Sequence, residues 1–331
     1  MFSPRRKIDL RWILPICAFL VSASSIVSAK DWNIITINGR EYVTASNVAN
    51  FYKIERLEKK GQTRTFRHPS LIMEWTIGAQ TIYVNRIKFN LSLNIAEYKG
   101  QALISTVDLA KLIDPVVRPS FIKKPIDFDT VVIDPGHGGH DTGAKGRQGF
   151  EKDYNLDLSL RLKTALEQRG FRTVMTRSTD VFIPLGGRVS MANAQKRAIF
   201  ISIHHNSTGG RTAAGVETYA LAPQGTASTN SPSGSGWTST LNGNIRDAEN
   251  IALATAVHAH VIHDLKPTDR GIKRARFNVL RGINKPAILY EGGFLTNPTE
   301  AARIHDPAYR QRTADSIANA VVKFKHAVGK R

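Results

Sequence analysis

Nine residues near the middle of the chain decide the fold, Val131-Val-Ile-Asp-Pro-Gly-His-Gly-Gly139. The run Thr130–Ile133 predicts a buried strand because it is short, apolar and rich in β-branched residues. A Gly-rich turn follows at once and holds His137. Functional sites of open α/β sheets lie at the carboxyl ends of strands. We therefore expect His137 to stand exposed at such a strand end.

From about residue 128 onward, strand and helix signals alternate. Strands are predicted at Thr130–Ile133, Phe171–Thr176, Ile199–Ile203, Val216–Leu221, Asn278–Arg281 and Ala287–Tyr290, and helices at Asp153–Arg169, Leu185–Lys196, Asp247–His263 and Ala308–Ala327. This alternation is typical of an α/β fold, with a mostly parallel sheet and helices on both faces. The polar segment Ala222–Gly243 predicts a mobile loop, which we expect near the mouth of the site.

The region before residue 121 has a different pattern, in which short β-type runs alternate with turn residues. Asn38-Gly39 between two such runs predicts a hairpin. Residues 39–49 are echoed by residues 100–110, and each copy predicts a turn, a strand and a helix start capped at Ser46 or Thr106. We therefore predict a small β-rich α+β domain over residues 30–120, followed by a linker over 121–127.

The first 29 residues have the features of an export signal. Basic residues precede the apolar run Trp12–Val27, and small residues end the segment at Ala29. The apolar run is shorter than the roughly 20 residues that a membrane-spanning helix needs. We therefore expect a cleaved signal peptide over 1–29 and no stable membrane insertion afterwards, with the catalytic domain over 128–331.

Composition excludes several classes of protein. Apolar residues make up 41% of the chain, which is enough for a core, and Cys17 is the only cysteine, so a disulfide scaffold and a Cys-rich zinc module are excluded. The net charge of +19 is strongly basic. In an exported protein this charge favours an anionic polymer as partner, and the absence of a recognition motif argues against nucleic acid.

Residues suited to metal catalysis follow other predicted strands as well. The pair His204-His205 ends one strand, Glu291 ends another, and Glu151 precedes the first long helix. Each of them alone could be a hydrogen-bonded structural residue. Together with His137, however, two imidazoles and a carboxylate around an open position suit a catalytic zinc, and the remaining carboxylate could accept a proton from water.

Four motifs, in this order, resemble the zinc-dependent N-acetylmuramoyl-L-alanine amidases of the Amidase_3 type. They are Asp134-Pro-Gly-His-Gly-Gly139, Glu151, Ser202-Ile-His-His-Asn206 and Glu291-Gly-Gly-Phe-Leu-Thr-Asn297. The resemblance covers residues 128–327. It implies a peptidoglycan hydrolase that cleaves the amide bond between N-acetylmuramic acid and the first L-alanine of the stem peptide, by means of zinc-activated water.

The resemblance also implies roles for single residues. It implies three zinc ligands, His137, Glu151 and His204; one catalytic carboxylate, Glu291; and two candidate substrate-binding residues, Asn206 and Arg188. The family usually has a small residue where this chain has His205, and we choose His204 as the ligand because it follows Ser-Ile as in the family. Neighbouring residues of an extended segment point opposite ways, so only one histidine should face the zinc. We expect nearby glycines such as Gly136 and Gly292 to make room for the bulky substrate.

Residues 30–120 resemble the N-terminal-like domain of copper amine oxidases, which also occurs on bacterial cell-wall proteins. We expect this domain to bind cell wall or a partner. For the whole protein we expect peptidoglycan and an activator protein as partners, and a location in the periplasm or cell envelope after export. Two alternatives stay open. One is a zinc peptidase or deacetylase that acts on cell wall; the other is a non-catalytic wall-binding protein, against which the presence of all four candidate residues argues.

Overall fold

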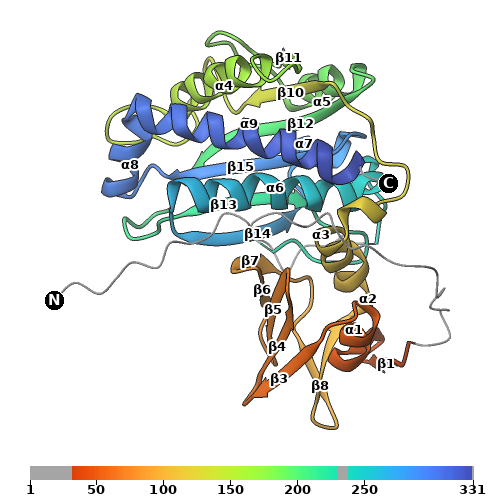
Figure 1. The fold of residues 1–331 in the computed structure, drawn as a ribbon. Helices are drawn as coiled ribbons and strands as arrows, with labels where there is room; N and C mark the ends of the chain where they lie inside the picture. Colours follow the sequence, from red (N-terminus) through yellow and green to blue (C-terminus); the bar gives the residue numbers. More distant parts are fainter. Residues whose placement is uncertain (1–31, 230–237, 330–331) are drawn as a thin grey trace.

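A computed structural model describes residues 32–229 and 238–329, so the predicted signal peptide lies outside the described residues (Figure 1). The part of the chain from residue 128 onward, predicted to be catalytic, is called the catalytic half below. Its described residues form six strands, β10 (Thr130–Pro135), β11 (Arg172–Met175), β12 (Ala198–Asn206), β13 (Val216–Leu221), β14 (Asp269–Ala275) and β15 (Ala287–Phe294). They lie side by side in the order β11-β10-β12-β15-β13-β14. Neighbours in the group β11-β10-β12-β15 are parallel, whereas β13 runs antiparallel to β15.

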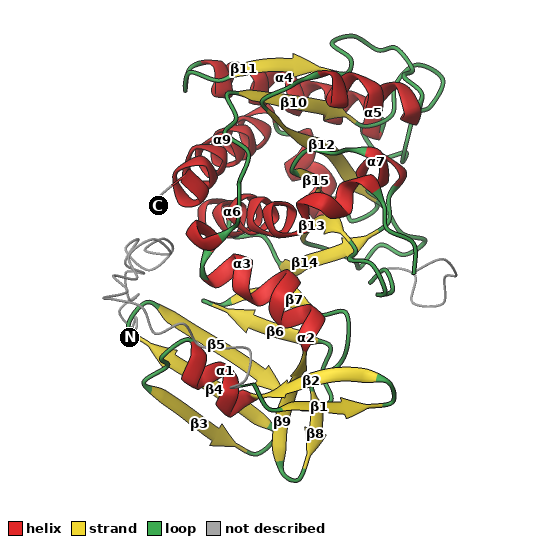
Figure 2. Ribbon diagram, turned by 90° about the vertical axis from the view of Figure 1, so that its right-hand side faces the viewer, coloured by secondary structure: helices red, strands yellow, loops and turns green. Residues whose placement is uncertain are grey.

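Helices cover both faces of this sheet, as the alternating pattern predicts (Figure 2). The helices are α4 (Glu151–Glu167), α5 (Leu185–Ala194), α6 (Asp247–Leu265), α7 (Asn278–Gly282), α8 (Pro298–His305) and α9 (Pro307–Gly329), with a 3-10 turn, η5, at Asn242–Arg246. Residues of β10 alternate between two cores: Val131 and Ile133 pack with α4, α6 and α9, and Val132 packs on the side of α5 and α7. Both faces of β10 are therefore buried, which explains its uninterrupted apolar run.

The N-terminal region extends the same sheet. Its elements are β1 (Ile34–Ile37), β2 (Arg40–Thr44), α1 (Ala45–Phe51), β3 (Arg56–Lys60), β4 (Thr63–His68), β5 (Leu71–Thr76), β6 (Thr81–Val84), β7 (Ile87–Asn90), β8 (Ala96–Tyr98), β9 (Gln101–Ser105), α2 (Thr106–Asp108), η3 (Leu109–Ile113), α3 (Asp114–Val117) and η4 (Pro119–Phe121). Strands β7 to β3 continue beyond β14 through the pairing of Phe89 with Ile272. The two halves of the chain thus share one 11-stranded sheet, a continuity that the sequence patterns do not predict.

The sequence echo in the N-terminal region corresponds to a structural repeat. A second sheet has the order β1-β2-β9-β8, in which β2 and β9 pair antiparallel at the centre. Each of these two strands leads into a helix, as predicted. The predicted caps Ser46 and Thr106 are wrong, however: the Thr44 side chain accepts a hydrogen bond from the Asn47 amide, and the Ser105 side chain accepts one from the Asp108 amide. The caps stand two positions earlier in the first copy and one position earlier in the second, because each strand continues directly into its helix.

Two local predictions in the catalytic half need correction. Helix α4 begins at Glu151 rather than Asp153, and residues 278–282 form helix α7 rather than a strand. The loop predicted over Ala222–Gly243 lies partly outside the described residues. Because β13 runs antiparallel to β15, the described start of this loop leaves the sheet at the edge away from Glu291. In this segment the Thr229 amide donates a hydrogen bond to the Arg274 carbonyl. No helix within the described ranges is both long and apolar enough to cross a membrane.

Candidate metal centre

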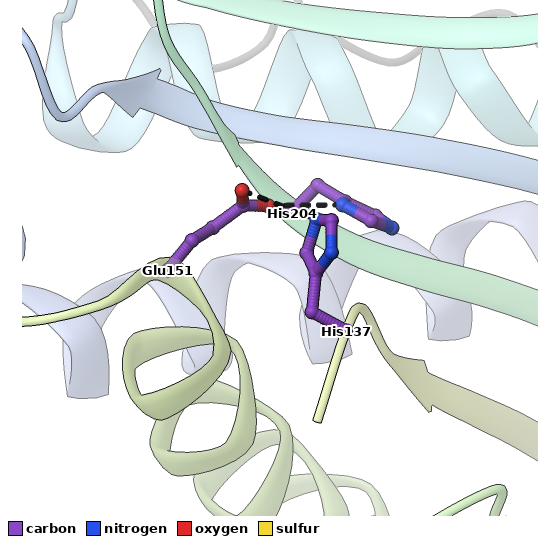
Figure 3. A group of neighbouring side chains, drawn as sticks. All are labelled: His137, Glu151 and His204. Carbon is purple, nitrogen blue, oxygen red and sulfur yellow. Dashed lines mark hydrogen bonds and ion pairs between the residues drawn. The ribbon is translucent and has the colours of Figure 1, made fainter. Parts of the chain in front are cut away.

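Three predicted ligands meet at the carboxyl edge of the sheet. His137 follows β10, His204 lies near the end of β12, and Glu151 is the first residue of α4. One potential ligand atom from each residue lies within 4.8 Å of the others (Figure 3). The strands β10 and β12 are parallel neighbours, so their ends bring the two histidines to one place. The start of α4 adds a carboxylate where the helix dipole favours negative charge.

The donor atoms of the cluster face one another. Glu151 Oε2 lies 3.2 Å from His137 Nε2, and Glu151 Oε1 lies 3.0 Å from His204 Nδ1. The two imidazole rings are 5.0 Å apart and nearly perpendicular. On its other side, His137 Nδ1 lies 2.9 Å from Asp141 Oδ1. This contact leaves Nε2 of His137 free to serve the cluster, in the way that outer carboxylates orient histidine ligands.

The electrostatics of the cluster favour a carboxylate beside imidazoles. Burial opposes ionisation of Glu151, but hydrogen bonds and charge interactions with His137 and His204 outweigh it and lower the pKa of Glu151. Burial also lowers the pKa of His137, yet the carboxylates of Glu151 and Asp141 raise it by more, so the net shift is upward. The ionised Glu151 carboxylate is therefore stabilised by its two imidazole neighbours.

His205 lies on the other side of β12, as the alternation of an extended strand requires. It is buried, and its Nδ1 lies 2.8 Å from Asn155 Oδ1 on α4. Burial lowers the pKa of His205 to about 4, so its ring is neutral near pH 7. His204, and not its neighbour, belongs to the group that could hold a metal ion.

Arg188, predicted to bind substrate, lies in the structure behind the metal-binding edge. Its side chain is 3% exposed and lies beneath the turn that carries His137. Its guanidinium donates to Asp134 Oδ1 at 2.8 Å and to the backbone carbonyls of Pro135 and His137, each at 2.7 Å. His137 has a φ of 60°, a left-handed conformation that histidine rarely adopts. These hydrogen bonds show that the Arg188 guanidinium fixes the turn that carries His137.

The glycines beside the cluster make room for the protein's own side chains, a role that the sequence analysis did not predict. A Cβ atom on Gly136 would lie 2.2 Å from the His204 ring, and one on Gly143 would lie 2.6 Å from Glu151 Oε2. Gly292 likewise faces the His205 ring at 3.0 Å. Glycine is thus required at these positions because an imidazole ring or a carboxylate packs directly against the backbone.

Glu291 stands on β15, directly beside His204 in the register of β12 and β15. Its Oε2 atom is buried and has no hydrogen-bond partner among the described residues. Burial raises the pKa of Glu291 well above its usual value, and the nearby carboxylates of Glu151 and Glu217 add to the shift. A polar atom left without a partner at a strand end is a mark of a functional position.

Sequence reasoning did not identify two carboxylates that support this edge. Asp134 is buried and accepts hydrogen bonds from Thr176, Arg188 and Ser202. Glu217 is also buried, and Asn206, the second candidate for substrate binding, donates to Glu217 Oε2 at 3.2 Å while remaining partly exposed. Asp134 lies within the quoted nonapeptide, whereas Glu217 lies in a strand whose direction no local pattern reveals.

The fold and the cluster together define a class: an α/β enzyme domain with a candidate metal centre at the carboxyl ends of parallel strands. Residues 131–323, more than half of the chain, match the family described as N-acetylmuramoyl-L-alanine amidase. The chain therefore belongs to the N-acetylmuramoyl-L-alanine amidase family and is a peptidoglycan hydrolase.

Individual relatives agree with this assignment. The chain is 32% identical over 219 residues to the N-acetylmuramoyl-L-alanine amidase AmiA of Escherichia coli, which covers 59% of this chain and 76% of that protein. It is 30% identical to LytC of Bacillus subtilis, covering 61% of this chain but only 37% of that longer protein. The crystal structure of N-acetylmuramoyl-L-alanine amidase from Clostridium difficile 630 is 33% identical, with a TM-score of 0.51 over 60% of this chain and 97% of that one.

Proposed function

We propose that this amidase uses one zinc ion held by His137, Glu151 and His204, with Glu291 as the general base. The observation that carries the proposal is the convergence of three donor atoms within 4.8 Å beside a carboxylate oxygen without a partner. The reaction is hydrolysis of the amide bond between N-acetylmuramic acid and L-alanine.

The donor set suits zinc. Two imidazole nitrogens and one carboxylate oxygen are the ligands of catalytic zinc sites, in which a fourth position stays open. The two imidazole nitrogens lie 3.2 and 3.0 Å from oxygens of Glu151, and the carboxylate supplies a negative charge that favours a cation. When bound there, zinc polarises an amide carbonyl and activates water near neutral pH.

Other residues of the chain position the ligands and transfer the proton. Asp141 holds the His137 ring, and Arg188 holds the turn that carries it. Glu291 takes the proton from the attacking water and returns it to the leaving nitrogen of L-alanine, which general acid–base catalysis requires of a group within hydrogen-bond reach. Burial and the nearby carboxylates raise the pKa of Glu291, which makes it a stronger base.

Digestion of purified muropeptides tests the proposal. We expect about one zinc ion per chain by elemental analysis, and mass spectrometry should show glycan strands separated from stem peptides that begin with a free L-alanine amine. Cleavage inside the peptide would instead indicate a peptidase, and loss of acetyl groups a deacetylase. Stoichiometric zinc without any product would support a non-catalytic wall-binding protein.

We also propose that the chain is exported to the periplasm or cell envelope and that residues 30–120 aid binding to cell wall or to a partner. Support comes from the N-terminal sequence features and from the basic composition. Protein isolated from the envelope should begin at Lys30; a chain that still begins at Met1 would contradict cleavage. Neutralising the exposed Lys59 and Lys60 of β3 should weaken co-sedimentation with peptidoglycan sacculi, and unchanged binding would contradict the proposed role.

A further inference from the structure

A second charged cluster lies beside Glu291, and the mechanism above does not use it. Its centre is Glu217 on β13, which is 2% exposed and directly opposite Glu291 in the antiparallel pairing of β13 with β15. Directly opposite residues of antiparallel strands project from the same face, so the two carboxylates are neighbours. Glu217 accepts hydrogen bonds from four groups: Asn206 Nδ2 at 3.2 Å, Tyr219 OH at 2.6 Å, Arg270 Nε at 2.6 Å and Lys273 Nζ at 2.7 Å.

Two cations therefore surround one carboxylate in this cluster. Glu217 is ionised, because its hydrogen bonds with Lys273, Tyr219 and Arg270 outweigh the effect of burial and lower its pKa. Arg270 and Lys273 are thus the two cations that stand against the carboxylates of Glu217 and Glu291 at this edge. A cation here with hydrogen-bonding capacity left over is suited to an anionic group of the substrate.

Arg270 is the member of the cluster with unused hydrogen-bonding capacity. Its Nε donates to Glu217, whereas its Nη1 and Nη2 atoms make no hydrogen bond with any residue in the described part of the chain. Its side chain is 35% exposed. The guanidinium carbon lies 4.8 Å from the centre of the Phe294 ring on β15, three residues after Glu291. Glu217 and Phe294 thus hold the guanidinium at the catalytic edge, with one side of it still available.

We infer that Arg270 binds a free carboxylate of the stem peptide close to the scissile amide, and so makes the enzyme selective for that carboxylate. The inference rests on the proposed amidase function, because it assigns a contact to the same substrate. A guanidinium presents paired N–H groups that match the two oxygens of a carboxylate. Arg270 is pre-oriented for this contact by Glu217, and the contact replaces no existing hydrogen bond.

Two synthetic muropeptides test the inference, differing only in whether the stem-peptide carboxyl next to L-alanine is free or amidated. Hydrogen bonds to charged groups predict that the parent prefers the free acid by roughly 10- to 100-fold in kcat/KM. Arg270→Met should lower kcat/KM for the free acid by about that factor and change the amidated substrate far less, so that the preference disappears. An equal loss on both substrates, or an unchanged preference, would overturn the inference.

Lys273→Met is the matched control, since it removes the other cation bound to Glu217. It should affect both substrates alike and leave the preference intact; a preference lost equally in this variant would overturn the assignment to Arg270. Calorimetric binding of the released stem peptides, free acid against amide, gives a readout without turnover. If the parent cleaves neither muropeptide, the amidase proposal fails, while binding still decides the role of Arg270: an Arg270-dependent preference for the acid supports it, and equal binding overturns it.

Discussion

Two carboxylates in different parts of the sheet region differ in their hydrogen bonding. Asp108, where the N-terminal strands join the catalytic half, is fully buried and accepts hydrogen bonds from the amides of Ser92 and Leu93, from Ser105 Oγ and from the Arg274 guanidinium. Glu291, at the catalytic edge, has a buried oxygen with no partner among the described residues. A carboxylate whose lone pairs are all occupied stabilises structure, whereas one held without partners is available for chemistry.

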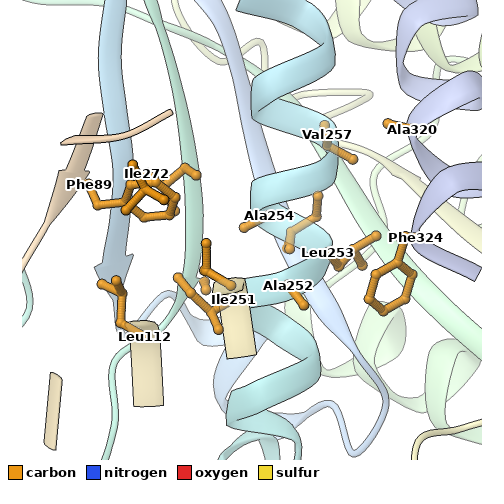
Figure 4. Packing of buried hydrophobic residues seen from close by; sticks show 14 of the residues in the cluster. Phe89, Leu112, Ile251, Ala252, Leu253, Ala254, Val257, Ile272, Ala320 and Phe324 are labelled. Carbon is orange, nitrogen blue, oxygen red and sulfur yellow. The ribbon is translucent and has the colours of Figure 1, made fainter. Parts of the chain in front are cut away.

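The junction around Asp108 differs from the catalytic edge in composition as well. Figure 4 shows Phe89 of β7 against Ile272 of β14, and Leu112 near Ile251 of α6, within one apolar cluster. Arg274 of β14 pairs with Asp108 inside this region. A charge pair enclosed by apolar side chains depends on both members, because loss of either leaves an uncompensated buried charge. The edge that carries His137, Glu151 and His204 is instead polar and partly open.

The largest effect is expected where the metal is held. His137→Ala should abolish stoichiometric zinc binding and reduce hydrolysis to background, because it removes one of three ligands, while the circular dichroism spectrum stays close to that of the parent. His205→Ala is the control: it removes the neighbouring imidazole that bonds Asn155, and it should retain zinc. Zinc retained by the first variant, or lost by the second, would contradict the ligand assignment.

The next largest effect is expected from a change at Glu291, and it tests whether this residue is the general base. Glu291→Gln nearly matches its shape but cannot accept the proton, so turnover should fall by about 10²- to 10⁴-fold. Zinc content and melting temperature should stay near the parental values, since Oε2 has no hydrogen bond to lose. Turnover and zinc occupancy are measured on the same sample. Near-parental turnover would refute the general-base role, and parallel loss of zinc would make Glu291 a ligand.

The corresponding change at the junction should act on stability instead of chemistry. Asp108→Ala leaves Arg274 buried without its counter-charge, and we expect the free energy of unfolding in urea to fall by about 3–5 kcal/mol. Turnover per bound zinc in the folded fraction should stay parental. Glu58→Ala, which breaks exposed ion pairs with Arg56 and Arg67, should cost less than about 1 kcal/mol. Equal losses in the two variants would remove the distinction between buried and exposed pairs.

The smallest effect concerns the residue that orients a ligand. Asp141→Asn weakens the contact that directs the His137 ring, and we expect zinc affinity to fall by about 10- to 100-fold, the usual range for outer partners of metal ligands. The Asp141 side chain is 43% exposed, which favours the lower end of that range. Competition with a chromophoric chelator measures the affinity. An unchanged dissociation constant would show that His137 is held by its backbone alone.

Much of the site could be predicted from the sequence because its residues directly follow apolar runs or glycine turns. His137 follows an apolar run and a glycine turn, and Glu291 ends another apolar run, so their place at strand ends depends on local pattern alone. The alternation of apolar runs with amphipathic helices likewise predicts a sheet covered on both faces. Asn38-Gly39 predicts the β1–β2 hairpin for the same reason, since positive φ angles at both residues determine the turn.

Other features depend on contacts between distant segments, and only the tertiary structure decided them. The antiparallel direction of β13 puts Glu217 beside Glu291 and moves the start of the 222–243 loop to the far edge. Arg188 is buried because residues 134–137 fold over it, and Gly136 is required because the His204 ring packs against it. The pairing of β7 with β14 joins the two halves of the chain. Local patterns in the sequence predict the buried strands and the residues that follow them, because propensity and periodicity are local, although they misplace the start of α4 and the two helix caps. The tertiary structure decided which of those ends meet and which side chains they bury, because strand direction and packing arise from the whole chain.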